Sequence, residues 1–142
     1  MRYLKIKTLR KGWCDKDEVL LHSAFQLLAD FIELEKPREL IDWNDDRQHR
    51  KAWKEICSLY HWWKEKRPAR KDPLDQRGLI MPPLRFKKIP GSDFNQVIQP
   101  DRMKYAKYYQ ALKKSIKLDQ KWHEEDQRNL HRLVDIRDFL WT

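Results

Sequence analysis

Glycine is scarce in this chain, with three in 142 residues against about ten at average usage. Glycine-rich phosphate loops and β-sandwiches need glycine for tight turns and close backbone approach, so the composition disfavours both. Cysteine is also rare: Cys14 and Cys57 are the only two, and neither lies in a C-x-x-C pair. Neither a zinc finger nor a redox motif is supported, and no disulfide is expected.

Long hydrophobic runs are missing too. No stretch approaches the roughly 18 apolar residues of a membrane span, and the beginning, MRYLKIKTLRKGW, is too polar for the hydrophobic core of a signal peptide. We therefore expect a cytosolic protein without membrane contact. Hydrophobic residues still make up 40% of the chain and include seven Trp, which is enough for a core in a single domain of this length.

Apolar residues recur with helical spacing in most of the chain, so we expect a mainly α fold, a compact bundle of three to four helices. Helices are predicted at residues 17–35, 44–66, 101–118 and 120–141, and the last two could join into one. Residues 3–9 alternate in polarity like a short strand, which could pair with residues 79–81 or 85–87. Five prolines between residues 67 and 100 predict a long irregular connection.

Basic residues are unevenly distributed within the net charge of +9. Residues 1–44 are balanced, whereas residues 67–100 hold seven basic against three acidic side chains, and residues 102–121 hold seven against Asp119 alone. Such clusters bind phosphate backbones, and aromatics such as Tyr105, Tyr108 and Tyr109 can stack on unpaired bases. The predicted nucleic-acid contacts are Arg67, Arg70, Lys71, Lys87, Lys88, Lys107, Lys113, Lys114 and Lys117. The alternative is a solvated helix face with the tyrosines in the core.

Carboxylates and histidines also interrupt the apolar helix faces. Asp119, His123 and Asp126 face one way on a continuous helix, and Asp45 and His49 are one turn apart. Helical bundles build metal sites from inward-facing groups of this kind, so these five residues are a candidate site for a divalent metal. In the alternative interpretation the apolar stripe shifts to Leu130, Leu133 and Ile136, and Asp45 is a helix cap.

Adjacent tryptophans form a third candidate site. On an α-helix Trp62 and Trp63 point about 100° apart, so we expect that both cannot enter one core. Trp62 is therefore predicted either to pack under the proline-rich connection or to anchor a partner, since Trp leads binding hot spots.

Three stretches resemble a family of small uncharacterised proteins encoded by tailed bacteriophages. They are KGWCDKDEVLLHSAFQLLADFIELEKP, HRKAWKEICSLYHWWKEKRPARKDPLD and LHRLVDIRDFLWT. The resemblance implies a protein that works in the cytoplasm of an infected bacterium, and it carries no activity with it.

The sequence as a whole predicts a phage-encoded, non-enzymatic protein that binds an acidic partner, most readily nucleic acid. No serine or cysteine lies in a recognisable nucleophile setting. Two alternatives stay open. One is a helical metal-binding protein or metal-dependent hydrolase, and the other is an inhibitor or adaptor that binds a host protein.

Overall fold

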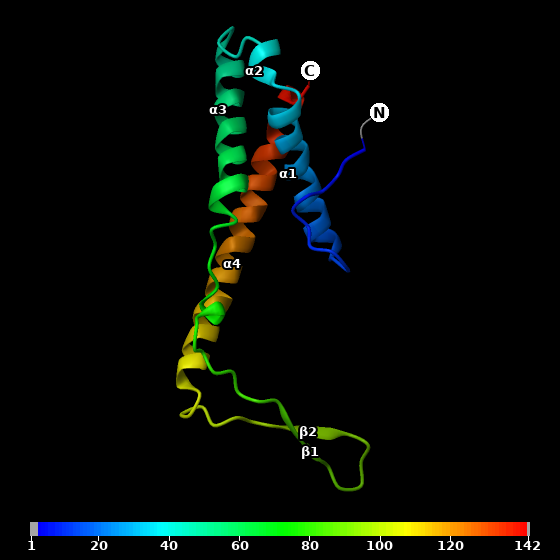
Figure 1. Cartoon of the computed structure of the whole chain (residues 1–142), viewed down its shortest axis with the longest axis vertical. Coiled ribbons are helices and arrows are strands. Elements are labelled where there is room, and N and C mark those ends of the chain that lie inside the picture. Colours follow the sequence, from blue (N-terminus) through cyan, green and yellow to red (C-terminus); the bar gives the residue numbers. More distant parts are fainter. Residues whose placement is uncertain (1–2, 142) are drawn as a thin grey trace. The chain divides into compact units, whose positions relative to one another are not determined.

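The computed structural model describes residues 3–141 and has a mainly α fold, as predicted. Four helices and one small antiparallel sheet make up its regular structure within that range (Figure 1). The elements in chain order are α1 (Lys16–Leu34), α2 (Pro37–Leu40), α3 (Arg47–His61), the π-helical turn η1 (Trp62–Lys66), the 3-10 turn η2 (Pro73–Asp75), β1 (Arg85–Lys88), β2 (Asn95–Ile98), α4 (Ala106–Asp135) and the 3-10 turn η3 (Arg137–Phe139). No helix among these residues is both long enough and apolar enough to cross a bilayer.

Residue contacts divide the chain into two compact units, where the length had suggested a single domain. The helical unit comprises the chain up to Arg70 together with the part from His123 onward. The basic unit comprises residues 71–122. Helix α4 contributes its first part to the basic unit and its last part to the helical unit.

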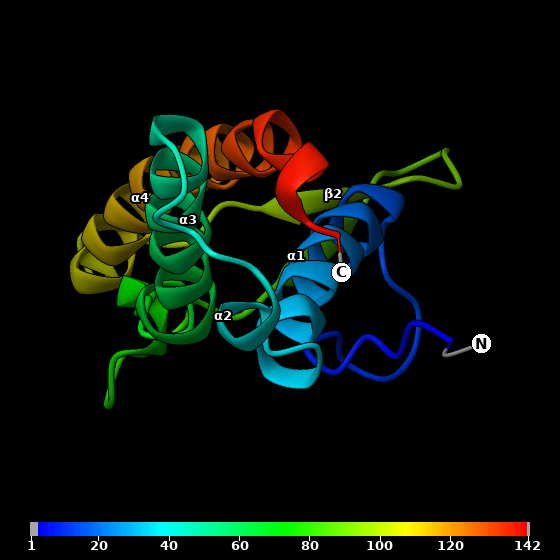
Figure 2. The same cartoon turned by 90° about the horizontal axis from the view of Figure 1, so that it is seen from above.

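The helical unit holds a core between α1, α3, η1 and the end of α4. Figure 2 shows these helices from above, with α2 in the connection between α1 and α3. Phe25 and Leu28 of α1 and Ile56 and Leu59 of α3 are completely buried, and Leu133 of α4 joins the same cluster. Burial of such side chains contributes about 1.5–3 kcal/mol each relative to exposure.

Helix α1 exposes three of its leucines and buries two polar side chains. Leu20, Leu27 and Leu34 are exposed, whereas the polar His22 and Gln26 are buried. Both polar residues have partners in the N-terminal segment. The Lys7 backbone N–H donates to Gln26 Oε1 at 3.1 Å, and the Thr8 hydroxyl lies 2.7 Å from His22 Nδ1. The segment therefore covers the polar side of α1, and buried polar atoms stay satisfied.

These same hydrogen bonds explain why the strand predicted at residues 3–9 is wrong. The segment is irregular, because the Lys7 backbone N–H and the Thr8 hydroxyl pair with side chains of α1 rather than with another strand. The predicted partner at residues 85–87 does form a strand, β1, which pairs antiparallel with β2. The connection 67–100 is therefore only partly irregular, since it contains η2 and this hairpin.

Helix α3 and turn η1 together cover the predicted helix 44–66. The N-cap of α3 is Asp46, which accepts a hydrogen bond from the His49 backbone N–H at 2.8 Å. The alternative interpretation had placed the cap at Asp45. In η1 the Arg67 N–H reaches the Trp62 carbonyl at 2.8 Å, an i to i+5 bond. This wider turn reduces the angle between consecutive side chains below the 100° of an α-helix.

Both tryptophans enter one core, and the prediction that they could not was wrong. Trp62 and Trp63 are each 4% exposed. The Phe25 ring stacks on Trp63 at a centroid distance of 4.7 Å and lies 5.1 Å from Trp62.

Helix α4 runs without a break through residue 119, so the two helices predicted at 101–118 and 120–141 are one. It begins at Ala106 because Asp101 organises the preceding turn, where its side chain accepts from the Met103 backbone N–H at 2.9 Å. Near its end the buried side chains are Asn129, Leu133 and Ile136, which agrees with the shifted stripe.

Candidate nucleic-acid interface

Positive charge is concentrated in the basic unit. Its 52 residues hold twelve Lys and Arg against five Asp and Glu, a net charge of +7. The other 90 residues hold nineteen against seventeen, a net charge of +2. Seven of the nine predicted nucleic-acid contacts lie in the basic unit, and the other two, Arg67 and Arg70, lie in the helical unit.

Arg67 and Arg70 are engaged inside the helical unit and do not present free guanidinium groups. Arg67 donates from Nε and Nη2 to the two carboxylate oxygens of Asp126 at 3.2 and 3.1 Å. Arg70 Nη2 donates to Asp126 at 2.7 Å and to Glu125 at 2.9 Å. Paired and largely buried arginines of this kind hold helices together, so their assignment as nucleic-acid contacts is corrected.

The same cluster explains the position of Trp62. Its indole Nε1 donates to Glu125 Oε1 at 2.7 Å, and the Arg70 guanidinium lies 5.7 Å from its ring centroid. Arg67 similarly lies 5.0 Å from the Trp63 ring. Trp62 is thus buried in the core. The prediction that it could anchor a partner at the surface is corrected.

A hollow of about 330 Å³ lies within the basic unit. One wall is the segment after η2, with Gln76 and Arg77, and the other is the beginning of α4, with Lys107, Gln110 and Lys114. The three α4 side chains follow i, i+3 and i+7 spacing, which places them on one helix face. Pro73, Gly78, Leu79 and Ala111 complete the lining, so no acidic residue of the described chain contributes to it.

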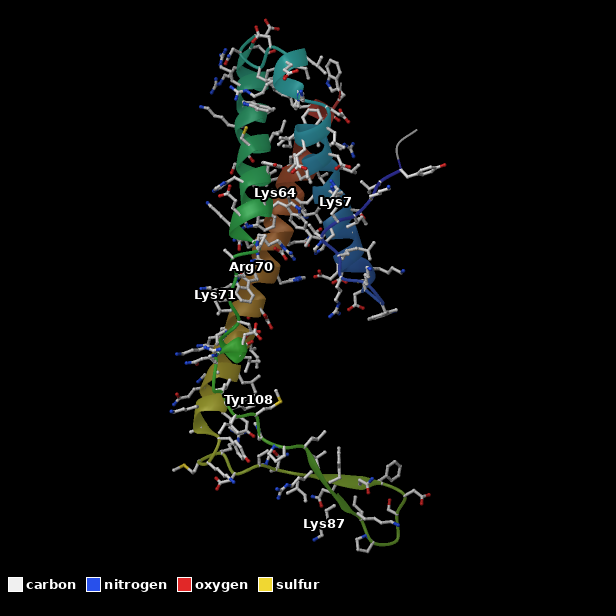
Figure 3. All side chains as sticks on the ribbon, viewed as in Figure 1. Lys7, Lys64, Arg70, Lys71, Lys87 and Tyr108 are labelled. Atoms are coloured by element: carbon white, nitrogen blue, oxygen red, sulfur yellow. The ribbon has the colours of Figure 1, made fainter. Side chains whose placement is uncertain are left out.

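All seven lysines predicted in the basic unit are exposed. None of them forms a salt bridge with a carboxylate of residues 3–141. Lys107 and Lys114 line the hollow, Lys87 and Lys88 belong to β1, and the other three are Lys71, Lys113 and Lys117. Figure 3 labels Lys71 and Lys87 among the side chains of this unit. Exposed and unpaired ammonium groups are the form in which lysine binds phosphate.

The sequence placed Arg77 in a basic cluster but not among the predicted contacts, and it did not indicate Gln76 or Gln110. The i, i+3 and i+7 spacing of Lys107, Gln110 and Lys114 in the sequence does predict a polar helix face. Arg77, in contrast, lies outside any regular element, in the segment that follows η2, and only the folded chain brings it to that face.

The tyrosines that had been considered as base-stacking groups are half-buried. The Lys104 ammonium lies 5.5 Å from the Tyr105 ring, and the Arg102 guanidinium lies 5.2 Å from the Tyr109 ring. Tyr108 packs edge-on against Tyr109 at a centroid distance of 5.4 Å. Their rings are therefore already in contact with neighbours in the basic unit.

The five candidate metal ligands do not assemble into a site. Within residues 3–141 no group of three or more His, Cys, Asp and Glu side chains is arranged to hold a metal ion. Asp126 accepts from two arginines, His49 Nδ1 lies 2.8 Å from the Asp46 carboxylate, and Asp45, Asp119 and His123 are exposed.

Several titratable groups of the helical unit have displaced pKa values with structural causes. The hydrogen bond from Lys64 lowers the pKa of Glu33, which also accepts from the Tyr60 hydroxyl at 2.9 Å. The paired Arg132 guanidinium likewise lowers the pKa of Glu55. Burial lowers the pKa of His22. The two carboxylates join neighbouring helices, a structural origin of such shifts that does not indicate catalysis.

Comparison with known proteins identifies no relative. No model of a protein family matches the chain, and neither a curated protein nor a solved structure is significantly similar to it. The resemblance to tailed-phage proteins therefore stays a prediction.

Proposed function

We propose that this protein binds nucleic acid through the basic unit, without enzymatic activity of its own. The observation that supports the proposal most directly is the division of charge, with +7 on 52 residues and +2 on the remaining 90. Exposed lysines without carboxylate partners, together with a hollow whose lining has no acid, provide positions for phosphate groups. If the resemblance to phage proteins holds, the ligand is phage or host nucleic acid in the infected bacterium.

The lining of the hollow supports phosphate binding there. Lys107 and Lys114 are two turns apart on one face of α4, and Arg77 also lines the hollow. A guanidinium can bind phosphate with two parallel hydrogen bonds, and the lysines add point charges. Gln76 and Gln110 contribute neutral donors that do not repel an anion.

The proposal is tested by the salt dependence of binding. Fluorescence anisotropy with labelled 15-nucleotide strands and 15-base-pair duplexes is measured between about 20 and 200 mM salt, and log K is plotted against log salt. The variant Lys107→Gln/Lys114→Gln should weaken binding and reduce the slope by about 0.7 to 0.9 for each phosphate that the protein no longer neutralises.

The matched control is Lys51→Gln/Lys54→Gln, which removes the same charge from exposed positions on α3 in the helical unit. It should leave the slope nearly unchanged. Undetectable binding at about 20 mM salt, where the electrostatic contribution is strongest, would overturn the proposal. If the two double variants weaken binding equally, binding depends on net charge alone and the hollow is not the binding site.

The two alternatives lose their structural support. The five candidate metal ligands do not assemble into a site among residues 3–141. The adaptor alternative used Trp62 together with residues 67–100, and of these Trp62 is buried.

A further inference from the structure

The hairpin of the basic unit exposes large apolar side chains on both of its faces. Every residue of β1 and β2 is exposed, including Phe86 at 57%, and Phe94 beside the turn is 75% exposed. An isolated two-stranded hairpin is at best marginally stable in water. The cross-strand pair of Phe86 with Val97 adds little to its stability, and more than half of the Phe86 side chain stays open to a ligand.

The register of the hairpin places cations around Phe86. Phe86 pairs with Val97 and Lys88 pairs with Asn95, so these four side chains share one face. Arg85 and Lys87 share the opposite face. An aromatic ring that is open to solvent therefore has a basic residue on each side of it along the strand and another on its own face.

An exposed aromatic ring surrounded by cations suits single-stranded nucleic acid better than a duplex. A duplex presents phosphates outward and keeps its bases stacked, so it would use the cations and leave the phenyl rings unused. A single strand presents phosphates and free base faces together. Proteins that bind single strands combine a positively charged track with aromatic rings on which bases stack.

The tyrosines of the basic unit are less suited to this role. Tyr105, Tyr108 and Tyr109 are half-buried and already contact a cation or another ring. Phe86 and Phe94 have no ring partner within residues 3–141 and have the largest exposed aromatic areas of the unit. They are the rings that an unpaired base can reach.

We propose that the hairpin is a stacking platform for single-stranded nucleic acid, with a base on Phe86 and phosphates on Arg85, Lys87 and Lys88. This inference rests on the proposed function and specifies its ligand class. It predicts that the protein prefers single strands to duplexes and that the preference depends on the Phe86 ring.

The test compares labelled dT15 and rU15 with a 15-base-pair duplex for wild type, Phe86→Ala, Phe86→Tyr and Leu84→Ala. Stacking of a base on an aromatic side chain corresponds to about a 5- to 150-fold change in affinity. Phe86→Ala should therefore weaken binding of dT15 and rU15 at least about 5-fold and leave duplex binding nearly unchanged. Phe86→Tyr keeps the ring and should retain affinity. Leu84→Ala is the control, because Leu84 is exposed, apolar and just before β1.

Each outcome bears on the inference separately from the proposed function. Equal affinity for duplex and single strands, or equal small effects of Phe86→Ala and Leu84→Ala, would overturn the stacking platform. Phosphate binding by Lys107 and Lys114 would survive that result. If the wild type binds no nucleic acid at low salt, both the stacking platform and the proposed function are overturned. Circular dichroism of each variant should match the wild type, because the substituted side chains are exposed.

Discussion

Asp126 is the residue whose removal should most clearly test the packing of the helical unit. It accepts two hydrogen bonds from Arg67, at 3.2 and 3.1 Å, and one from Arg70 at 2.7 Å. The side chains of Asp126, Arg67 and Arg70 are only 15, 20 and 16% exposed. Asp126→Ala therefore leaves two mostly buried guanidinium groups without their main acceptor.

The expected cost follows from this burial. Removing one partner of a buried pair costs about 3–5 kcal/mol, whereas exposed pairs contribute about 0.2–1 kcal/mol. Arg70 keeps Glu125 at 2.9 Å, and water can reach the edge of the cluster. We therefore expect Asp126→Ala to reduce the free energy of unfolding by about 2–3 kcal/mol, and the melting temperature by about 6–10 °C at this chain length.

Urea denaturation followed by tryptophan fluorescence measures the effect, because Trp62 and Trp63 contact the two arginines. Asp119→Ala is the matched control: Asp119 is exposed in the same helix, so the change in helix propensity is the same. It should change stability by less than about 0.5 kcal/mol. The effects of Arg67→Ala and Asp126→Ala should fall short of additivity in the double variant. A loss for Asp126→Ala no larger than that for Asp119→Ala would refute the reasoning.

Three further predictions concern the same unit. Burial lowers the pKa of His22 below 6.5, so the unfolded state binds more protons and stability should fall as the pH drops below 6.5. The urea midpoints at pH 7.5 and pH 5.5 should therefore differ less for His22→Gln than for the wild type. The same difference in both proteins would contradict this. The Lys64 hydrogen bond lowers the pKa of Glu33, so the contribution of this pair to folding stability is present above pH 4.5 and is lost on acidification. Glu33→Gln should therefore lose less stability than the wild type between about pH 5 and 3. The same loss in the variant as in the wild type would count against the pairing. Trp62→Phe removes the hydrogen bond to Glu125 and should cost about 1.5–3 kcal/mol, the value for a bond to a charged group, by thermal denaturation; a loss below about 0.5 kcal/mol would show that this hydrogen bond is unimportant.

The helices were predictable because their signals are local. Apolar spacing and the flanking prolines placed α1 and α3 within a few residues of their observed bounds. The strand expected at residues 3–9 failed for a different reason. Alternating polarity shows that a segment could be a strand, but pairing decides whether it is, and Lys7 and Thr8 found partners on α1 instead.

The candidate sites show the same division. The sequence indicated where lysines and arginines are dense, and seven of the nine predicted contacts are exposed in the basic unit. It could not indicate that Arg67 and Arg70 are paired, because their partner Asp126 is more than fifty residues away in the chain. Asp126 itself was predicted as a metal ligand from helical spacing alone, which takes no account of a neighbouring helix.

By itself the sequence determined the helical class, the excess of positive charge toward its second half and the approximate extent of α1 and α3, since propensity, periodicity and composition act over a few neighbouring residues. Only the tertiary structure decided which charges are free and which are neutralised, and that both Trp62 and Trp63 enter the core. It also decided that the exposed aromatic rings of the basic unit are Phe86 and Phe94 on the hairpin. These properties depend on contacts between distant segments, and such contacts exist only when the chain is folded.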